Sequence, residues 1–311
     1  MTAYIARRLL LMVPVIFGIL LLTFAIKALI PSDAVAALFE GQVTEEQSAE
    51  TAATIRHKYG LDRPWYVQFA DYSGKVLTGD LGESIRTRRP VIDEIGFRYL
   101  NTLELTVAAL AIGVVLGLIT GIVAAYYKDS WIDTAVMTIG LFGISMPAFF
   151  FSLAMLLVFS VWLEWLPVVP RGGAGLLMPA LTLGLIESAP ISRIVRSSML
   201  DVLGREYIRA ARARGVPPRM LLLRHALPNA LLAVVTLVGL QFGGLLGGAF
   251  IVEIMFGWRG VGELAVRAIQ WRDFALTQGV ILIGSAIYVS VNLLVDLAYT
   301  LIDPRIRYGE P

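Results

Sequence analysis

The chain has 311 residues, of which 57% are hydrophobic and 16% are charged, against a usual charged fraction of about 25% in soluble domains. This composition indicates a bundle of membrane helices rather than the soluble domains that the length alone would suggest. The sequence contains no cysteine, which excludes disulfides and thiolate metal sites. The net charge of +2 is uninformative by itself, whereas the distribution of the basic residues is informative.

The first apolar run spans Leu9–Ile26. A membrane-spanning helix needs about 20 residues, and Lys27 can extend this run to Ile30 by placing its ammonium group at the membrane surface. A signal peptide is the alternative, because residues 34–36 resemble a cleavage site. The run is longer than a signal peptide needs and Lys27 separates it from that site, so we expect a first span within residues 1–30.

Residues 31–101 form the long polar segment of the chain, and their turn and cap residues predict a folded extracytoplasmic loop. Thr44 and Gln47 have the spacing of a capping box. Pro64 and Pro90 each stand where a proline can open a helix with one apolar face. Such faces fit helices that lie on the membrane surface or against the bundle.

Five further apolar stretches predict five more spans in the remaining part of the chain, residues 102–311. They are Leu105–Tyr127, Thr134–Trp162, Gly172–Ser192, Ala226–Val252 and Phe274–Val295. The fourth span is the weakest of the six, because Glu187 and Pro190 interrupt it. The sequence therefore predicts an all-α integral membrane protein with six transmembrane helices.

The basic residues set the orientation of these helices. Lysine and arginine accumulate on the cytoplasmic side, and an internal N-terminus places Lys128, the Arg193–Arg224 cluster and Arg305 there. Residues 31–101 also contain arginines, but segments beyond about 60 residues cross membranes largely regardless of charge. We therefore expect both termini in the cytoplasm and residues 31–101 outside.

Polar and flexible groups inside the predicted spans are candidates for function. Pro147 frees a backbone carbonyl and can kink the third span, as a gate or as a packing bend. Glycines four residues apart in the fifth span allow close packing, either within this chain or against a second membrane protein. The candidates for a translocation path or gate are Ser145, Met146, Pro147, Gln241 and Gly244.

Charged groups in or beside the spans are few. Glu187 and Asp296 lie within apolar stretches, and Glu253 and Lys27 lie near the predicted outer surface, where they could pair. A proton-coupled transporter would need carboxylates that are deeper and more numerous. An ion-gradient-driven secondary transporter nevertheless stays open as one interpretation of the chain, and a structural membrane scaffold stays open as another.

No pattern in the sequence predicts catalysis or a metal site. A nucleotide-hydrolysing P-loop needs Gly-Lys followed by serine or threonine, but the sole Gly-Lys pair, Gly74-Lys75, precedes Val76. The two histidines, His57 and His225, fall on opposite sides of the membrane in the predicted topology and cannot share a metal. We therefore expect a chain that is not an enzyme and binds no cofactor or metal of its own.

The stretch 201–230 is basic and lies between two apolar runs. Its alanines and arginines favour a helix from Glu206, with Tyr207, Ala210, Ala211 and Arg214 on one face. The two alanines leave that face flat enough for another protein to approach closely.

The same stretch contains clear signals for the end of that helix. Gly215 stands where a helix C-terminus favours a left-handed residue, and Pro217 and Pro218 prevent the helix from continuing. A second short helix is expected near Arg219. A positive cytoplasmic loop without a partner would be the simplest alternative.

This pattern resembles the cytoplasmic coupling loop of ABC importer permeases, and its glutamate stands apart from the paired alanines as in the peptide-transport branch. The coupling-loop candidates are Glu206, Tyr207, Ala210, Ala211, Arg214, Gly215, Leu227 and Pro228. Residues 79–84 (Gly-Asp-Leu-Gly-Glu-Ser), 257–263 and the C-terminal tail also resemble dipeptide, oligopeptide and nickel permeases. The resemblance thus runs from the first span to the C-terminus.

The resemblance implies the permease subunit of an ATP-driven importer for a small peptide or related solute, in a bacterial or archaeal plasma membrane. The implied partners are a second homologous permease, two ABC ATPase subunits that hold ATP and magnesium, and an extracytoplasmic binding protein. Membrane lipid but no nucleic acid would contact the chain. The candidates for contact with the binding protein are Asp80, Glu83, Arg86, Arg88, Trp258 and Arg259.

Overall fold

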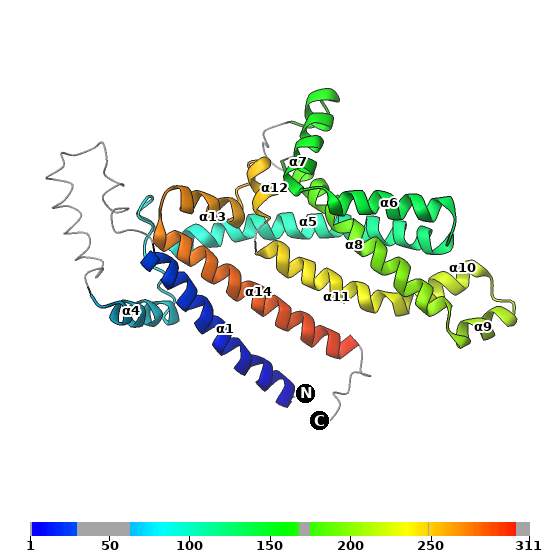
Figure 1. Cartoon of the computed structure of the whole chain (residues 1–311), viewed down its shortest axis with the longest axis horizontal. Coiled ribbons are helices and arrows are strands. Elements are labelled where there is room, and N and C mark those ends of the chain that lie inside the picture. The colour runs from blue at the N-terminus through cyan, green and yellow to red at the C-terminus, as the bar shows by residue number, and fades with distance from the viewer. Residues whose placement is uncertain (1, 30–62, 168–174, 248, 303–311) are drawn as a thin grey trace. The chain divides into compact units, whose positions relative to one another are not determined.

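A computed structural model describes residues 2–29, 63–167, 175–247 and 249–302, and it is almost entirely helical (Figure 1). The predicted capping box at Thr44 and Gln47 lies outside these residues. The helices are α1 (Thr2–Leu29), α4 (Trp65–Leu77), α5 (Val91–Tyr126), α6 (Trp131–Ser145), α7 (Ala148–Leu156), η1 (Leu157–Trp162), α8 (Leu177–Leu203), α9 (Glu206–Ala213), α10 (Pro218–Met220), η3 (Leu221–Ala226), α11 (Leu227–Leu246), α12 (Phe250–Met255), α13 (Val261–Gln270) and α14 (Phe274–Ile302).

Three stretches of described helix are long and apolar enough to cross a membrane: Val91–Tyr126, Pro218–Leu246 and Phe274–Val295. The pair Trp131–Ser145 and Ala148–Trp162 adds a fourth if it counts as one span, although the chain bends by 105° between its halves. A shorter apolar stretch, Leu10–Ala25, lies in α1. A helical membrane fold is therefore confirmed, while the count of six spans stays a prediction.

Several element boundaries differ from the prediction; α8, for example, ends at Leu203 rather than at Ser192. A separate helix after Pro90 was wrong, because α5 runs without interruption from Val91 into the second span. The fifth span ends at Leu246 rather than Val252, which belongs to the short helix α12. The kink predicted at Pro147 is a complete break, since Met146 is extended and Pro147 begins a new helix direction.

The chain forms two compact units, and each is described by itself. Unit 1 comprises Met1–Arg98 and Leu264–Ala286, and unit 2 comprises Tyr99–Glu263 and Ile287–Pro311. In unit 1, the predicted apolar face of α4 packs on α1, where the Phe69 ring lies 5.9 Å from Phe17 and 5.4 Å from Phe24, both edge to face. Such aromatic pairs stabilise by about 0.5–1.5 kcal/mol beyond the area they bury.

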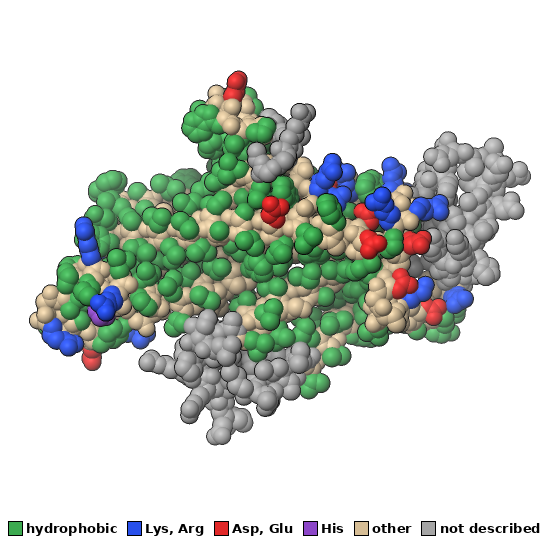
Figure 2. Space-filling view, turned by 180° about the vertical axis from the view of Figure 1, so that it is seen from behind, with side chains coloured by type: hydrophobic (Ala, Val, Ile, Leu, Met, Phe, Trp, Pro, Cys, Tyr) green, Lys and Arg blue, Asp and Glu red, His purple; other side chains and the backbone are tan. Residues whose placement is uncertain are grey.

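Helix α8 is the centre of unit 2, because it packs against more of that unit's described elements than any other helix: α6, α7, α9, α11, α12 and η3. One apolar cluster joins it to α5, α9, η3 and α11, and the other joins it to α5, α7, α11 and α12. Glycine allows the close approach of α5: a Cβ on Gly117 would lie 2.6 Å from an Ile191 methyl carbon. Hydrophobic side chains cover the long faces of these helices, and Figure 2 shows Lys and Arg side chains both at the end that carries α9 and elsewhere on the molecule, where they are mixed with Asp and Glu.

The glycines of the fifth span pack within the chain. A Cβ on Gly239 would lie 2.5 Å from Val295 of α14, and one on Gly243 would lie 3.3 Å from Val291. Gly244, in contrast, faces open space, with no described atom within 4 Å of a built Cβ. Of the two alternatives for these repeats, intramolecular packing therefore holds for Gly239 and Gly243.

Candidate functional site

The basic loop forms helix α9, and its end has the geometry that the sequence predicted. Gly215 has a φ of +80°, the left-handed conformation in which side-chain-bearing residues are strained. Its N–H donates to the Arg212 carbonyl at 3.0 Å, and the following Val216 N–H donates to Ala211 at 3.3 Å. No described atom lies within 4 Å of a Cβ built on Gly215, so the turn is open at the surface.

Helix α9 presents a narrower outward face than predicted. Glu206, Tyr207, Ala210 and Arg214 are exposed. Ala211 was expected beside Ala210 on that face, but it is buried together with Ile208 against α8 and η3. The reason is that a helix of eight residues anchors itself through one apolar stripe, and Ile208 and Ala211, three residues apart, form that stripe.

The second predicted short helix begins at Pro218, as α10, and passes into the π-helix η3 and then α11. Leu227 and Pro228 are the first residues of α11, where a proline leaves no hydrogen bond unmade. Asn229, which the sequence analysis missed, donates its side-chain amide to the Tyr207 hydroxyl at 3.3 Å and to the His225 carbonyl at 2.8 Å. Its position directly after Leu-Pro was the only available signal.

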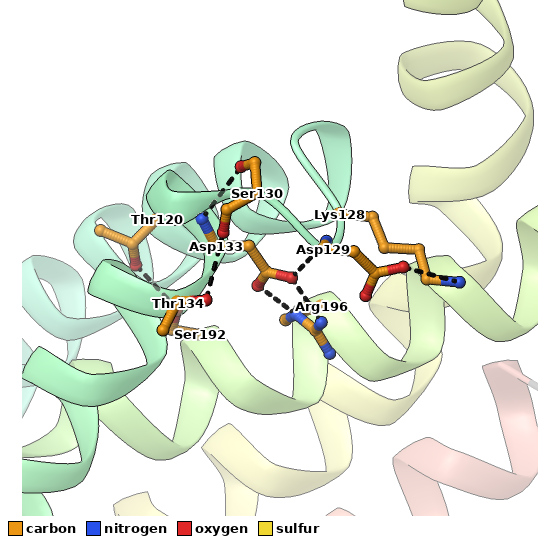
Figure 3. Close-up of polar contacts among 8 residues, drawn as sticks. All are labelled: Thr120, Lys128, Asp129, Ser130, Asp133, Thr134, Ser192 and Arg196. Atoms are coloured by element: carbon orange, nitrogen blue, oxygen red, sulfur yellow. Dashed lines mark hydrogen bonds and ion pairs between the residues drawn. The ribbon is translucent and has the colours of Figure 1, made fainter.

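A polar cluster at the same end of unit 2 was also missed (Figure 3). The Arg196 guanidinium of α8 binds Asp133 of α6 with two nitrogens, Nε to Oδ1 at 2.5 Å and Nη2 to Oδ2 at 2.6 Å. Asp133 is buried, and its Oδ2 also accepts the Asp129 N–H at 3.0 Å. Ser130 caps α6 by accepting the Asp133 N–H at 3.4 Å. One carboxylate thus ties the turn after α5, the start of α6 and the body of α8 together.

The candidate path residues fall into two separate groups. Ser145, Met146 and Pro147 are exposed at the break between α6 and α7. Gln241 instead lies beside α8, where its Nε2 donates to the Glu187 carbonyl at 3.4 Å and its buried Oε1 has no hydrogen-bond partner among the described residues. A buried side-chain oxygen without a hydrogen-bond partner is unusual between apolar helices.

The candidate contacts for a binding protein belong to different units. Asp80, Glu83, Arg86 and Arg88 are exposed in unit 1. Their loop is held by Asp273, a residue that the sequence analysis did not single out. One carboxylate oxygen of Asp273 accepts the Ser84 hydroxyl at 2.5 Å and the Arg86 N–H at 3.2 Å, while the other accepts the Leu276 N–H at 3.1 Å.

Trp258 and Arg259 lie in unit 2, on a turn that is hydrogen-bonded to the start of the second span. The Asn101 backbone carbonyl accepts the Trp258 indole N–H at 3.0 Å, and the Asn101 side-chain amide donates to the Arg259 carbonyl at 2.8 Å. The buried Glu253 accepts the Thr102 hydroxyl at 2.8 Å and the Glu263 N–H at 2.9 Å. The predicted pair of Glu253 with Lys27 stays a prediction, because the Lys27 side chain lies outside the described ones.

Within the described part of the chain, no group of three or more His, Cys, Asp or Glu side chains is arranged to hold a metal ion. The coupling-loop candidates lie on and around one exposed helix, α9, which is packed on the central helix α8.

Comparisons with known proteins identify this arrangement. The family described as binding-protein-dependent transport system inner membrane component matches residues 113–308, and its N-terminal counterpart matches residues 1–106. The glutathione transport system permease protein GsiC of Escherichia coli K12 is 41% identical over 309 residues, which cover 99% of this chain and 100% of that protein. GsiC of Salmonella choleraesuis has the same identity and coverage.

Solved structures agree on the fold. A chain of the inward-facing MetNI methionine ABC transporter superposes with a TM-score of 0.58 at 18% identity, covering 68% of this chain and 96% of that chain. An amino acid ABC transporter gives a TM-score of 0.51 at 20% identity, covering 69% and 94%. The chain therefore belongs to the family of binding-protein-dependent transport system inner membrane components, the permease subunits of ABC importers.

Proposed function

We propose that the exposed face of α9 is the surface on which an ABC ATPase subunit docks. The observation that carries this proposal is the structure of α9 itself, which buries Ile208 and Ala211 beneath it and leaves Tyr207, Ala210 and Arg214 exposed. A small residue, Ala210, at the middle of the exposed face permits close approach of another protein. Exposed ion pairs from Arg214 or Glu206 would add only about 0–1 kcal/mol each, so shape matters more than charge.

The ATPase dock implies a division of labour between subunits. The chain supplies the membrane path, and two ABC ATPase subunits bind and hydrolyse ATP with magnesium on the cytoplasmic side. A second homologous permease completes the path, and an extracytoplasmic binding protein delivers the solute to the loops around Arg86 and Trp258. This chain itself is not an enzyme and binds neither cofactor nor metal in the proposal.

The proposed topology has six spans with both termini in the cytoplasm. It takes α8 as the fourth span and the broken pair α6–α7 as the third. Residues 1–30, 31–101 and 102–311 then form the first span, the extracytoplasmic loop and the permease core, in a bacterial or archaeal plasma membrane. The cluster of arginines from Arg193 to Arg224, in and around α9, supports this orientation.

The proposed solute is a small peptide or a chemically related molecule. Support comes from the relatives that are named glutathione permeases and share 41% of the residues over the full length of the chain. The exposed break at Ser145–Pro147, the unpartnered Gln241 oxygen and the open Gly244 are the proposed elements of the path or gate.

Purification of the tagged chain from its native membrane in mild detergent tests the proposal, with identification of the copurifying proteins by mass spectrometry. We expect a second permease and one or two P-loop ATPases. Recovery of the chain alone or as a homo-oligomer in several detergents would contradict it. Glutathione uptake that collapses with an uncoupler while ATP stays high would point instead to an ion-gradient-driven transporter.

A further inference from the structure

The Asp133–Arg196 pair lies between the proposed ATPase dock and the broken third span. Arg196 is adjacent on α8 to Val195, which belongs with Met199 and Val202 to the cluster that seats Ile208 of α9. Helix α9 therefore packs on the C-terminal turns of α8. Any displacement of α9 by a docked protein acts first on this part of α8, because packed interiors shift as units rather than deform smoothly.

Helix α6 starts at this pair and ends at the break. Asp133 lies in its first turn, and Ser145 is its last residue before the chain turns by 105° into α7. A helix of 15 residues is about 22 Å long, so α6 spans much of the apolar layer from the pair to the break. The position of its first turn therefore sets the position of Ser145–Pro147.

Elsewhere in the contact between α6 and α8, small residues face one another and leave no large side chains to interdigitate. Cβ atoms built on Gly140 and Gly143 would lie 3.7 Å and 4.0 Å from the Ala189 Cβ, which is ordinary contact between small groups. Smooth surfaces of this kind allow helices to slide past one another. A two-pronged arginine–carboxylate pair, in contrast, fixes both distance and orientation.

We propose that Asp133 and Arg196 are positioning residues that make α6 move together with α8 and α9 during the ATP cycle. The pair transfers the motion of the docked helix to the break at Ser145–Pro147. This inference rests on the proposed role of α9 as the ATPase dock. It assigns to the ion pair a role in coupling in addition to its role in holding the fold.

The absence of cysteine from the chain allows a direct test by distance measurement. Spin labels are placed on Asp201→Cys at the end of α8 and on Ile139→Cys of α6, both exposed positions. The importer is assembled with its partner subunits, and the label-to-label distance is measured without nucleotide and with a non-hydrolysable ATP analogue. Arg196→Lys replaces the guanidinium group, which donates two hydrogen bonds to Asp133, with the single point charge of an ammonium group. Arg193→Lys is the matched control, because Arg193 is an exposed arginine one turn away on α8, with no ion pair within the described residues.

The expected result is an unchanged distance on nucleotide binding in the parent and in Arg193→Lys, and a shift of about 1–2 Å in Arg196→Lys, the size of helix shifts in switching proteins. Should Arg196→Lys fail to assemble, the double variant Asp133→Leu/Arg196→Met keeps apolar volume in place of the pair and must show the same shift. An unchanged distance in the variant tested would overturn the inference while leaving the dock intact. A nucleotide-dependent change of this distance in the parent would also overturn the inference, because α6 would then move independently of α8. Failure of the parental chain to assemble with any ATPase subunit would overturn the dock and this inference together.

Discussion

Substitution of Gly215 separates backbone strain from steric block at the proposed dock. Its φ of +80° means that any side chain there adopts the left-handed conformation, at a cost of about 1–2 kcal/mol. No described atom lies within 4 Å of a built Cβ, so alanine meets no clash and the tryptophan side chain starts from an open point on the surface. Gly215→Ala and Gly215→Trp therefore carry similar strain, and only the tryptophan adds bulk to the outer surface.

Two measurements distinguish these effects. Thermal unfolding of the detergent-solubilised chain should give the two variants similar stabilities, both slightly below that of the parent. Capture of the ATPase subunit on the tagged chain, with solute uptake in parallel, should be retained by Gly215→Ala and lost in Gly215→Trp. Parental uptake by Gly215→Trp would refute the reasoning, because nothing would then dock against this turn. Equal losses in both variants would show that strain alone accounts for the effect.

Three further substitutions test the packing and the loops. Gly117→Val should lower the free energy of unfolding of the purified chain by about 1–3 kcal/mol, because its Cβ would lie 2.6 Å from a methyl carbon of α8. Gly244→Ala faces open space in α11, so stability should stay the same or rise by up to about 1 kcal/mol through the higher helix propensity of alanine. Equal stabilities of the two variants would contradict this packing. Asp273→Asn weakens the hydrogen bonds that hold the loop from Ser84. Limited trypsin digestion of that loop should therefore accelerate severalfold relative to the exposed control Asp93→Asn. Identical digestion rates would refute the anchoring role. Tyr207→Phe removes one long hydrogen bond of 3.3 Å at an exposed site. The free energy of unfolding should therefore change by less than about 0.5 kcal/mol. A larger loss would show a stronger link between α9 and α11.

Local signals predicted the parts of the fold that depend on neighbours in sequence. Pro64 marked the start of α4, Gly215 marked the end of α9, and Pro147 marked the interruption of the third span. Proline restricts its own backbone, and glycine permits the left-handed conformation that ends a helix. The family resemblance rested on the same local patterns.

Contacts between distant residues carried no such signal. Asp133 and Arg196 are separated by 63 positions, and Ser84 and Asp273 by 189, so neither pair could be recognised from spacing. Ala211 was placed on the outer face because helical periodicity defines faces without saying which one is covered. Packing against α8 and η3 decides which face of α9 is buried.

Cross-linking from a single cysteine on α9 tests the central proposal most directly, since the chain has no cysteine of its own. Ala210→Cys places a thiol at the middle of the exposed face, and Phe142→Cys places one on the exposed surface of α6, with 66% of that phenylalanine accessible. A short bifunctional reagent is applied to native membranes, and the products are identified by mass spectrometry. The account predicts a covalent product of this chain with a P-loop ATPase from Ala210→Cys and none from Phe142→Cys. The absence of that product from Ala210→Cys, in membranes where the importer is active, would contradict the account.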